Sequence, residues 1–364
     1  MPNPVITADA ELHTLCAHLA HAPWIALDTE FMRERTYRAR LCLIQVATPD
    51  CIACIDTLAP MDLSPLLDTL YRPTTVKVLH AARQDFEVLA DLRGLPPQPL
   101  FDTQIAAALL GYDNQIGYGP LVEALLGHKL LKLEARTDWS RRPLSPAQLE
   151  YAEDDVRYLR DVYRVLTERL QAVGRADWFA EECAALTDPA LYRTDPAEAW
   201  RRLNAGAMLA PAQQTTLVAL AEWREHEAQS RDLPRGWVVP DNALVEIARR
   251  TPNSMETLAE ITELKPPMVR REGEAILQLL GQARPQPEQP YWEKHDRLDG
   301  PQMDLIKKLS QVVQQRAQTA QINPTLIAPR RELTRLVRGD ADCALLRGWR
   351  RRFIGEELLA LCAH

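Results

Sequence analysis

The sequence predicts an α/β domain with a mixed sheet of about five strands, followed by two all-helical domains. Short apolar runs with strand-like alternation come first along the chain, helical periodicity is interleaved with them, and helices then become dominant. From about residue 210 every periodic stretch has helical spacing. At 364 residues the chain is also too long for one compact core.

The elements of the first domain follow from the spacing of its apolar residues. Thr7 is a candidate N-cap for a helix that ends near residue 20, because a threonine side chain can accept a hydrogen bond from the first helical turn. Turn residues such as Pro49 and Asp50 separate two of the apolar runs. The predicted strands are 24–27, 41–47, 51–55 and 76–79, and the later helices are 85–92, 103–110, 121–126 and 147–171.

Prolines mark the boundaries between the domains. Residues 172–209 contain Pro189 and Pro196 and are expected to form a helical or irregular connector. The segment GQARPQPEQP, at 281–290, is typical of a linker because prolines are frequent in it. The predicted organisation is a first domain at 1–171, a connector at 172–209, a second domain at 210–289, a Pro-rich linker at 290–300 and a third domain at 301–364.

Composition restricts the class of protein. The N-terminal stretch has neither the basic nor the apolar region of a signal peptide, and no apolar run approaches the roughly 20 residues that span a bilayer. The seven cysteines show no framework spacing and are expected to stay reduced. We therefore expect a cytoplasmic protein with no membrane partner, and no stable protein partner is inferred.

The charge is unevenly distributed along the chain. The net charge is −7, but residues 1–170 hold 17 basic and 23 acidic side chains, whereas residues 301–364 hold 11 basic and 6 acidic ones. An acidic N-terminal region followed by a basic C-terminal region is typical of a metal-using enzyme with an additional phosphate-binding region. A solvated surface explains the modest positive charge of the tail equally well.

Two acids stand at the end of the first predicted strand, in WIALDTEF. Asp28 and Glu30 are separated by one residue, so both carboxylates point to the same face of a strand. Neighbouring carboxylates repel each other, and a divalent cation such as Mg²⁺ or Mn²⁺ is a suitable counter-charge. Taken alone, this pattern is also explained by a pair of exposed acids at a strand end.

Further candidates follow in later segments. Asp85 lies in the first turn of a predicted helix, where the helix dipole by itself accounts for an acid. Tyr151 and Asp155 are four residues apart in a predicted helix and share a face, although for Tyr151 taken alone a half-buried aromatic is the more frequent situation. Asp102 precedes a helix and is interpreted as a structural N-cap. For His80, which ends an apolar strand, a core or hydrogen-bonded role is expected.

Together these segments resemble the three exonuclease motifs of the DEDD superfamily, in the subgroup whose third motif has a tyrosine four residues before the aspartate. LDTEF, IQVA, the H-A-x-x-x-D of His80–Asp85, FDTQ at 101–104 and LSPAQLEYAEDDVRYL are similar to the bacterial ribonuclease D family over residues 1–170. The resemblance implies an RNase H-like exonuclease fold. No acid of the motifs is missing, which argues against the alternative of a non-catalytic RNA-binding module.

The resemblance also assigns roles to matching residues. It implies that two divalent metal ions, Mg²⁺ or Mn²⁺, are held by four acids, and that Tyr151 orients the attacking water. These acids are Asp28, Glu30, Asp85 and Asp155. It implies trimming of RNA, such as tRNA precursors with single-stranded 3′ ends, with release of 5′-mononucleotides. Phe31 and Gln45 are candidate substrate-binding residues, and both positions are equally compatible with the core.

The second domain resembles the HRDC domain found in helicases and in ribonuclease D, through LVALAEWREHEAQSRDLPRGWVVPDNALVEIARRTPNSMETLAEI and EGEAILQLL. Residues 301–364 are similar to a second, divergent copy, most clearly in ALLRGWRRRFIGEELLAL. The resemblance implies helical bundles that hold RNA chiefly through phosphate contacts, with protein-interaction or structural modules as the alternative. The three arginines at 350–352 are compatible with a phosphate contact or a solvated helix face.

The acids alone do not distinguish RNA from DNA, because the metal chemistry acts on the phosphate. A DNA 3′–5′ exonuclease of repair is therefore the alternative function. No polymerase-like region follows the first domain, which argues against proofreading. The side chains that would sense the ribose 2′-hydroxyl are not identified by any motif.

Overall fold

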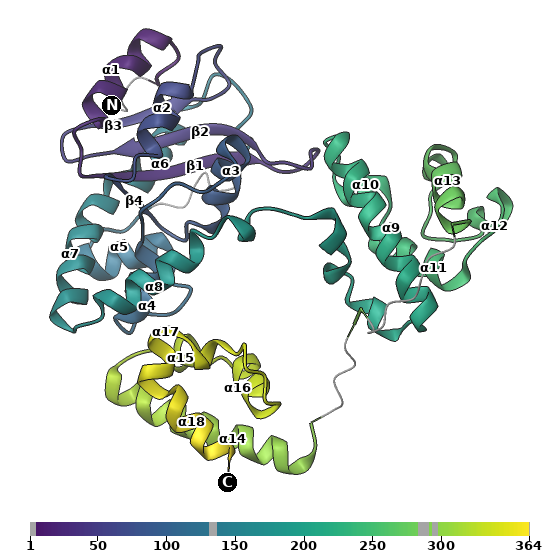
Figure 1. Ribbon diagram of the computed structural model, residues 1–364. Coiled ribbons are helices and arrows are strands. Elements are labelled where there is room, and N and C mark those ends of the chain that lie inside the picture. Colours follow the sequence, from purple (N-terminus) through teal and green to yellow (C-terminus); the bar gives the residue numbers. More distant parts are fainter. Residues whose placement is uncertain (1–4, 131–136, 283–290, 293–297, 364) are drawn as a thin grey trace. The chain divides into compact units, whose positions relative to one another are not determined.

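The computed structural model of the chain describes residues 5–130, 137–282, 291–292 and 298–363 (Figure 1). The chain forms two compact units, each made of more than one stretch. The sheet unit comprises Met1–Met32, Leu41–Tyr192 and Leu298–His364. The helical unit comprises Arg33–Arg40 and Arg193–Arg297. The predicted Pro-rich linker at 290–300 lies mostly outside the described residues.

A five-stranded mixed sheet is the basis of the sheet unit, in agreement with the prediction. The strand order is β3-β2-β1-β4-β5, in which β2 is antiparallel to β3, and β4 is parallel to both β1 and β5. The strands are β1 (Trp24–Met32), β2 (Arg40–Ala47), β3 (Ile52–Asp56), β4 (Val76–Leu79) and β5 (Leu100–Asp102).

Two strands differ from the prediction. β1 continues to Met32, so Asp28 and Glu30 lie within the strand and not at its end. β5 has only three residues, which is too short for alternation to be recognised in the sequence. In β2 every residue from Cys42 to Ala47 is buried, and this explains why the strand is a continuous apolar run with little alternation.

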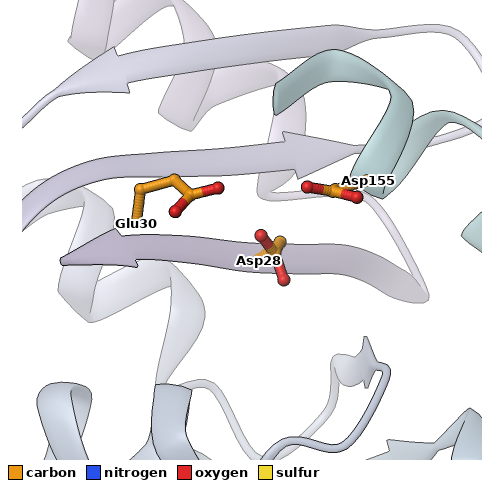
Figure 2. A group of neighbouring side chains, drawn as sticks. All are labelled: Asp28, Glu30 and Asp155. Carbon is orange, nitrogen blue, oxygen red and sulfur yellow. The ribbon is translucent and has the colours of Figure 1, made fainter. Parts of the chain in front are cut away.

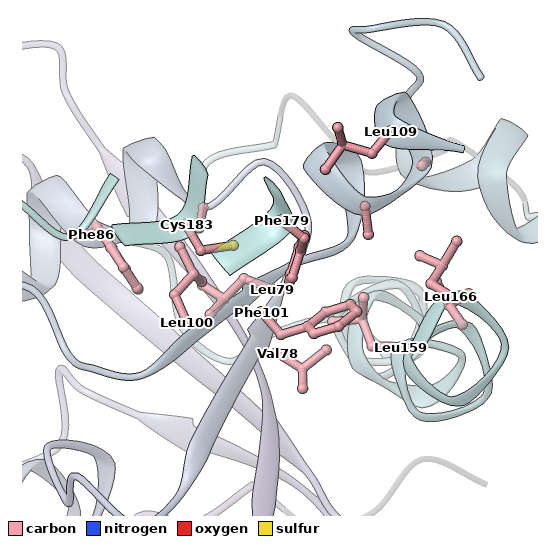
Figure 3. Packing of buried hydrophobic residues seen from close by; sticks show 14 of the residues in the cluster. Val78, Leu79, Phe86, Leu100, Phe101, Leu109, Leu159, Leu166, Phe179 and Cys183 are labelled. Carbon is pink, nitrogen blue, oxygen red and sulfur yellow. The ribbon is translucent and has the colours of Figure 1, made fainter. Parts of the chain in front are cut away.

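Helices packed on the sheet complete the α/β part. They are α1 (Asp9–Leu19), α2 (Ser64–Leu70), α3 (Arg83–Arg93), α4 (Thr103–Leu109), α5 (Tyr118–Leu126), α6 (Pro146–Arg157), α7 (Leu159–Ala172) and α8 (Ala176–Leu186). Figure 3 shows part of the shared core, which includes Phe101 of β5 and Phe179 of α8. Their ring centroids are 4.4 Å apart, and Phe101 also meets Tyr163 of α7 edge-on. Aromatic packing therefore holds α7 and α8 on the sheet.

The sequence predicts one helix over 147–171, but the structure has two helices with a break at Tyr158. In an uninterrupted helix the N–H of Tyr158 would donate to the carbonyl of Asp154. Instead, that carbonyl accepts a hydrogen bond from the hydroxyl of Tyr118, and the N–H of Tyr158 donates to the same hydroxyl. A side chain inserted into the helical hydrogen bonds is a recognised cause of such breaks.

The C-terminal helices share a core with the α/β part. They are α14 (Gly300–Ala320), α15 (Pro324–Ile327), α16 (Arg330–Val337), α17 (Gly348–Arg350) and α18 (Glu356–Cys362), with a π-helical turn at Arg351–Gly355. Trp349 stacks on Trp178 of α8, with ring centroids 4.5 Å apart. The backbone N–H of Trp349 donates to Glu181 and its indole N–H donates to Glu182, both at 2.6 Å. These helices are thus an integral part of the sheet unit.

The helical unit has its own hydrophobic core. Its helices are α9 (Pro211–Ser230), α10 (Arg235–Val238), α11 (Asp241–Arg250), α12 (Met255–Ala259) and α13 (Pro266–Leu280). Two 3₁₀ segments of the same unit precede them, Pro196–Arg202 and Asn204–Met208, and a third, Pro189–Leu191, lies at the end of the sheet unit. Among the described residues, no helix has the length and apolarity required to cross a membrane.

The segment Arg33–Arg40, between β1 and β2, belongs to the helical unit. The hydroxyl of Tyr37 donates to Glu225 of α9, and the guanidinium of Arg235 lies over the Tyr37 ring, 4.6 Å from its centroid. Asp232 accepts hydrogen bonds from the backbone N–H groups of Tyr37 and Arg38, both at 3.1 Å. These contacts join residues almost 200 positions apart, so no local pattern in the sequence could indicate them.

Candidate active site

Strand β1 places Asp28 and Glu30 at the edge of the paired part of the sheet. β4 pairs with β1 only as far as Ala26, which lies opposite Val78. The chain of β4 leaves the sheet soon afterwards and turns into α3. On the side of β4, the part of β1 that carries the two acids therefore faces the start of a helix, while β2 adjoins β1 on its other side. Sites at the carboxyl ends of parallel strands are common.

The turn between β4 and α3 places Asp85 in the first turn of α3. Asp102 fixes this turn because its carboxylate accepts the backbone N–H of Ala81 at 3.2 Å and that of Ala82 at 2.8 Å. It also accepts the N–H of Gln104 at 2.8 Å and so caps α4. The structural interpretation of Asp102 is confirmed.

Helix α6 supplies Tyr151 and Asp155, which lie one turn apart. Its start is defined by a capping box between Ser145 and Gln148, with Pro146 in the first turn. The hydroxyl of Tyr151 is hydrogen-bonded to the carboxylate of Asp155. This hydrogen bond fixes the positions of the two side chains relative to each other.

Three of the predicted acids form a tight cluster. One carboxylate oxygen from each of Asp28, Glu30 and Asp155 lies within 4.8 Å of the others, and Figure 2 shows these three side chains together, two from β1 and one from α6. Asp85 is held beside them, because its Oδ1 accepts the backbone N–H of Thr29 at 3.1 Å and the hydroxyl of Thr29 at 2.6 Å. All four acids line one cavity of about 430 Å³.

Burial is the largest influence on each of the four acids and raises the pKa of all of them. The neighbouring carboxylates raise the pKa of Asp28 further. The pKa of Glu30 rises to about 9. The pKa values of Asp85 and Asp155 rise only to about 7, because hydrogen bonds from neighbouring hydroxyl groups partly offset the effect of burial. Without a cation the cluster therefore retains protons at neutral pH, and a divalent cation would relieve the repulsion.

The two candidate substrate-binding residues lie in different surroundings. Phe31 lines the cavity, together with Tyr151. Gln45 is not among the described residues that line it, and it is fully buried in β2 opposite Cys54. His80 also lines the cavity, but its ring nitrogens contact the hydroxyl of Thr103 at 2.9 Å and the carbonyl of Ile116 at 3.0 Å. His80 thus has the hydrogen-bonded role that its position in the sequence predicts.

Trp139 and Tyr118 line the cavity without having been identified from the sequence. The Trp139 ring lies 6.1 Å from that of Tyr151. Arg142 fixes the position of Trp139. It donates to the carbonyl of Trp139 at 2.7 Å and to the carboxylate of Asp56 through two hydrogen bonds of 2.6 and 2.7 Å. The available signal was DWSRRPLS, directly before the third acidic motif, in which a Trp and an Arg stand beside a turn.

The basic residues at the C-terminal end are largely engaged within the protein. Arg350 pairs with Glu182 of α8, and Arg352 pairs with Glu181. Arg351 lies 3.4 Å from Glu356. The positive charge of this stretch is therefore partly neutralised by carboxylates of the same unit.

Comparison with known proteins places these features in two families. A family model described as 3′–5′ exonuclease matches residues 4–171, and a model of the HRDC domain matches residues 213–280. The chain is 41% identical to ribonuclease D of Granulibacter bethesdensis over 99% of its own length and 93% of that protein. Ribonuclease D of Nitrobacter hamburgensis is also 41% identical, over 98% of this chain and 94% of that protein.

Solved structures agree with this comparison. Escherichia coli RNase D, described as an exoribonuclease involved in structured RNA processing, is 34% identical, with a TM-score of 0.91 over 100% of this chain and 99% of that one. The catalytic core of RRP6 from Trypanosoma brucei is 25% identical, with a TM-score of 0.60 over 76% of this chain and 78% of that one. The similarity to RNase D therefore extends through the helical regions as well as the α/β part.

Proposed function

The chain belongs to the ribonuclease D family, whose activity is 3′–5′ exoribonuclease action, and from this membership we propose that it trims the 3′ ends of precursor tRNA and other small RNAs, releasing 5′-mononucleotides. The description of the E. coli relative as acting on structured RNA supports this substrate class over DNA. We further propose that it acts in the cytoplasm.

The observation that carries the proposal is the cluster of acids at the junction of β1, α3 and α6. Three carboxylates within 4.8 Å, with a fourth beside them, repel one another when ionised, and burial makes that repulsion stronger. Such a set of oxygen donors fits hard divalent cations. The proposed ligands are Asp28, Glu30, Asp85 and Asp155, and we propose that they hold two ions, Mg²⁺ or Mn²⁺.

When bound, such ions would supply a nucleophilic hydroxide at neutral pH and stabilise the charge that develops on the phosphate. The chain's own residues supply position. Tyr151 donates its hydroxyl toward Asp155 and is well placed to orient the attacking water by a hydrogen bond. Burial, followed by the nearby carboxylates, raises the pKa of Tyr151 well above its ordinary value, so the hydroxyl acts as a donor and not as a base. Phe31 is available to stack on the terminal base.

We propose that the HRDC region binds RNA, mainly through phosphate contacts. Its match to the HRDC model over residues 213–280 supports this role. We also propose the division into domains at 1–171, 210–289 and 301–364, in which the last is a divergent HRDC-like copy whose helices pack on the α/β part within the sheet unit.

The test is an assay with a 5′-labelled RNA that carries a single-stranded 3′ extension, beside a DNA of the same sequence. With Mg²⁺ or Mn²⁺ we expect stepwise shortening of the RNA from its 3′ end and mononucleotide products carrying a 5′-phosphate. Asp28→Ala should abolish shortening but retain RNA binding, and Asp50→Ala, at an exposed site outside the cavity, is the matched control. Preferred degradation of the DNA, or full activity of Asp28→Ala, would contradict the proposal.

A further inference from the structure

The hydroxyl of Tyr118 occupies a gap in the helical hydrogen bonds directly beside Asp155. It donates to the carbonyl of Asp154 at 3.0 Å, and it accepts the N–H of Tyr158. In a regular helix these two backbone groups would bond to each other. An oxygen atom placed between them must separate them, and the separated turn contains Asp155.

Tyr118 itself is firmly held. It is the first residue of α5, its side chain is half-buried, and its ring lies 5.6 Å from that of His80. His80 is fixed in turn by its contacts with Thr103 and with the carbonyl of Ile116. The inserted hydroxyl therefore comes from a rigid support and not from a mobile surface side chain.

Tyr118 also faces the acids, since it lines the same cavity as Asp28 and Asp155. Burial, followed by the charges of these two acids, raises the pKa of Tyr118 well above its ordinary value. The phenol therefore keeps its proton at neutral pH and continues to donate to the carbonyl of Asp154.

We propose that Tyr118 is a positioning residue that directs the carboxylate of Asp155 toward Asp28 and Glu30 by holding open the last turn of α6. This inference rests on the proposed function, because it takes Asp155 as a ligand of the divalent ions. Without the hydroxyl, the N–H of Tyr158 and the carbonyl of Asp154 would close into a regular helical bond. The side chain of Asp155 would then turn with the backbone and leave the cluster.

The test uses Tyr118→Phe, which removes only the hydroxyl. The matched control is Tyr192→Phe, in the same unit, because the Tyr192 hydroxyl likewise donates to a main-chain carbonyl, that of Leu186 at 2.6 Å, but does not line the cavity. Two quantities are measured: the dissociation constant of Mn²⁺ by calorimetry on RNA-free protein, and kcat and KM on a short RNA.

For Tyr118→Phe we expect the Mn²⁺ dissociation constant to rise about tenfold and kcat to fall about tenfold with little change in KM, as for other residues that orient metal ligands. Tyr192→Phe should stay within about twofold of the wild type in each quantity, since the bond it loses does not orient a ligand. A wild-type Mn²⁺ affinity for Tyr118→Phe would overturn the proposal. Failure of this variant to fold would also overturn it, because the hydroxyl would then serve the fold as a whole.

A double-mutant cycle shows whether Tyr118 acts through Asp155. In an Asp155→Asn background, Tyr118→Phe should not weaken Mn²⁺ binding further, because the carboxylate that it positions is already lost. An equal loss in both backgrounds would show that Tyr118 acts in another way. These outcomes are separate from the proposed function, which fails if the wild-type protein neither binds Mn²⁺ nor shortens RNA.

Discussion

Thr29 donates both its backbone N–H and its hydroxyl to Oδ1 of Asp85, at 3.1 and 2.6 Å. Thr29 stands between the two acids of β1, so these bonds tie the strand to the first turn of α3. They also favour the ionised form of a carboxyl group whose burial alone would keep it neutral. One residue, Thr29, therefore influences both the position and the charge of Asp85.

Replacing Thr29 by valine should shift the pH dependence of the enzyme. Burial raises the pKa of Asp85 to about 7, and the Thr29 hydroxyl is a group that lowers it, so its loss should raise the pKa further. Because a divalent cation binds the ionised form, the pH at which the affinity for Mn²⁺ reaches half its maximum should move up by about half a unit to one unit. Thr167→Val, whose hydroxyl bonds within α7, is the control, and superimposable profiles would contradict the assignment.

Without divalent cations, the stability of the folded protein should fall as the pH rises. The folded pKa is about 9 for Glu30 and about 7 for Asp85 and Asp155, above the values of about 4 expected in the unfolded chain. The metal-free folded state therefore binds protons more tightly than the unfolded state. The contribution of these carboxyl groups to the free energy of unfolding is therefore fully present below about pH 4 and is lost as the pH rises to about 9.

Divalent cations bind the ionised carboxylates, so their stabilising effect should grow over the same pH range. The measurement is the melting temperature at pH 6 and pH 8.5, in EDTA and in Mg²⁺. The difference between the two conditions should be larger at pH 8.5 and should shrink in Asp155→Asn. A difference that does not depend on pH would show that the cluster does not exchange protons for cations.

Tyr151→Phe should slow chemistry without removing the metal. The hydroxyl of Tyr151 bonds to Asp155 and is proposed to orient the attacking water, so kcat should fall by about 10² or more, as expected for loss of such a group. The affinity for Mn²⁺ should change little because all four carboxylates remain. Single-turnover rates on a short RNA measure the effect, with Tyr163→Phe in α7 as the control. A rate close to that of the wild type would remove Tyr151 from the mechanism.

Trp349→Ala should destabilise the sheet unit by about 3–5 kcal/mol, the usual cost of truncating a buried tryptophan. Trp349 is 1% exposed, stacks on Trp178 and donates to Glu181 and Glu182. Trp237→Ala, at a residue that is 49% exposed, should have almost no effect. Urea unfolding measures both variants. Equal stabilities would mean that the C-terminal helices add little to the fold.

The sequence predicts those features that depend on local spacing. The alternation in WIALDTEF indicates that Asp28 and Glu30 project together, and their carboxylates do lie within 4.8 Å of each other. The spacing of Tyr151 and Asp155 predicts a shared helical face, and the two side chains are hydrogen-bonded. The mixed sheet and the cap at Asp102 are predicted for the same reason.

Features that depend on distant contacts leave no such signal. At the break at Tyr158 the helix is hydrogen-bonded to the hydroxyl of Tyr118, which lies 40 positions earlier in the chain, and no local periodicity indicates such a contact. The packing of Trp349 on Trp178 likewise joins two segments that look like ordinary amphipathic helices. Gln45, in contrast, lies inside the apolar run LCLIQVA. This run indicates the core position that the structure shows, whereas the substrate-binding interpretation does not account for full burial.

The contacts of Tyr37 have a consequence for how the protein could be divided. Because Arg33–Arg40 belongs to the helical unit, the chain passes from one unit to the other four times, after Met32, Arg40, Tyr192 and Arg297. A gene fragment encoding residues 193–297 would lack Tyr37, whose hydroxyl donates to Glu225. A fragment encoding the α/β part alone would contain Tyr37 without Glu225. Recombination that exchanged this helical module between proteins would therefore have to exchange the short loop of the nuclease as well.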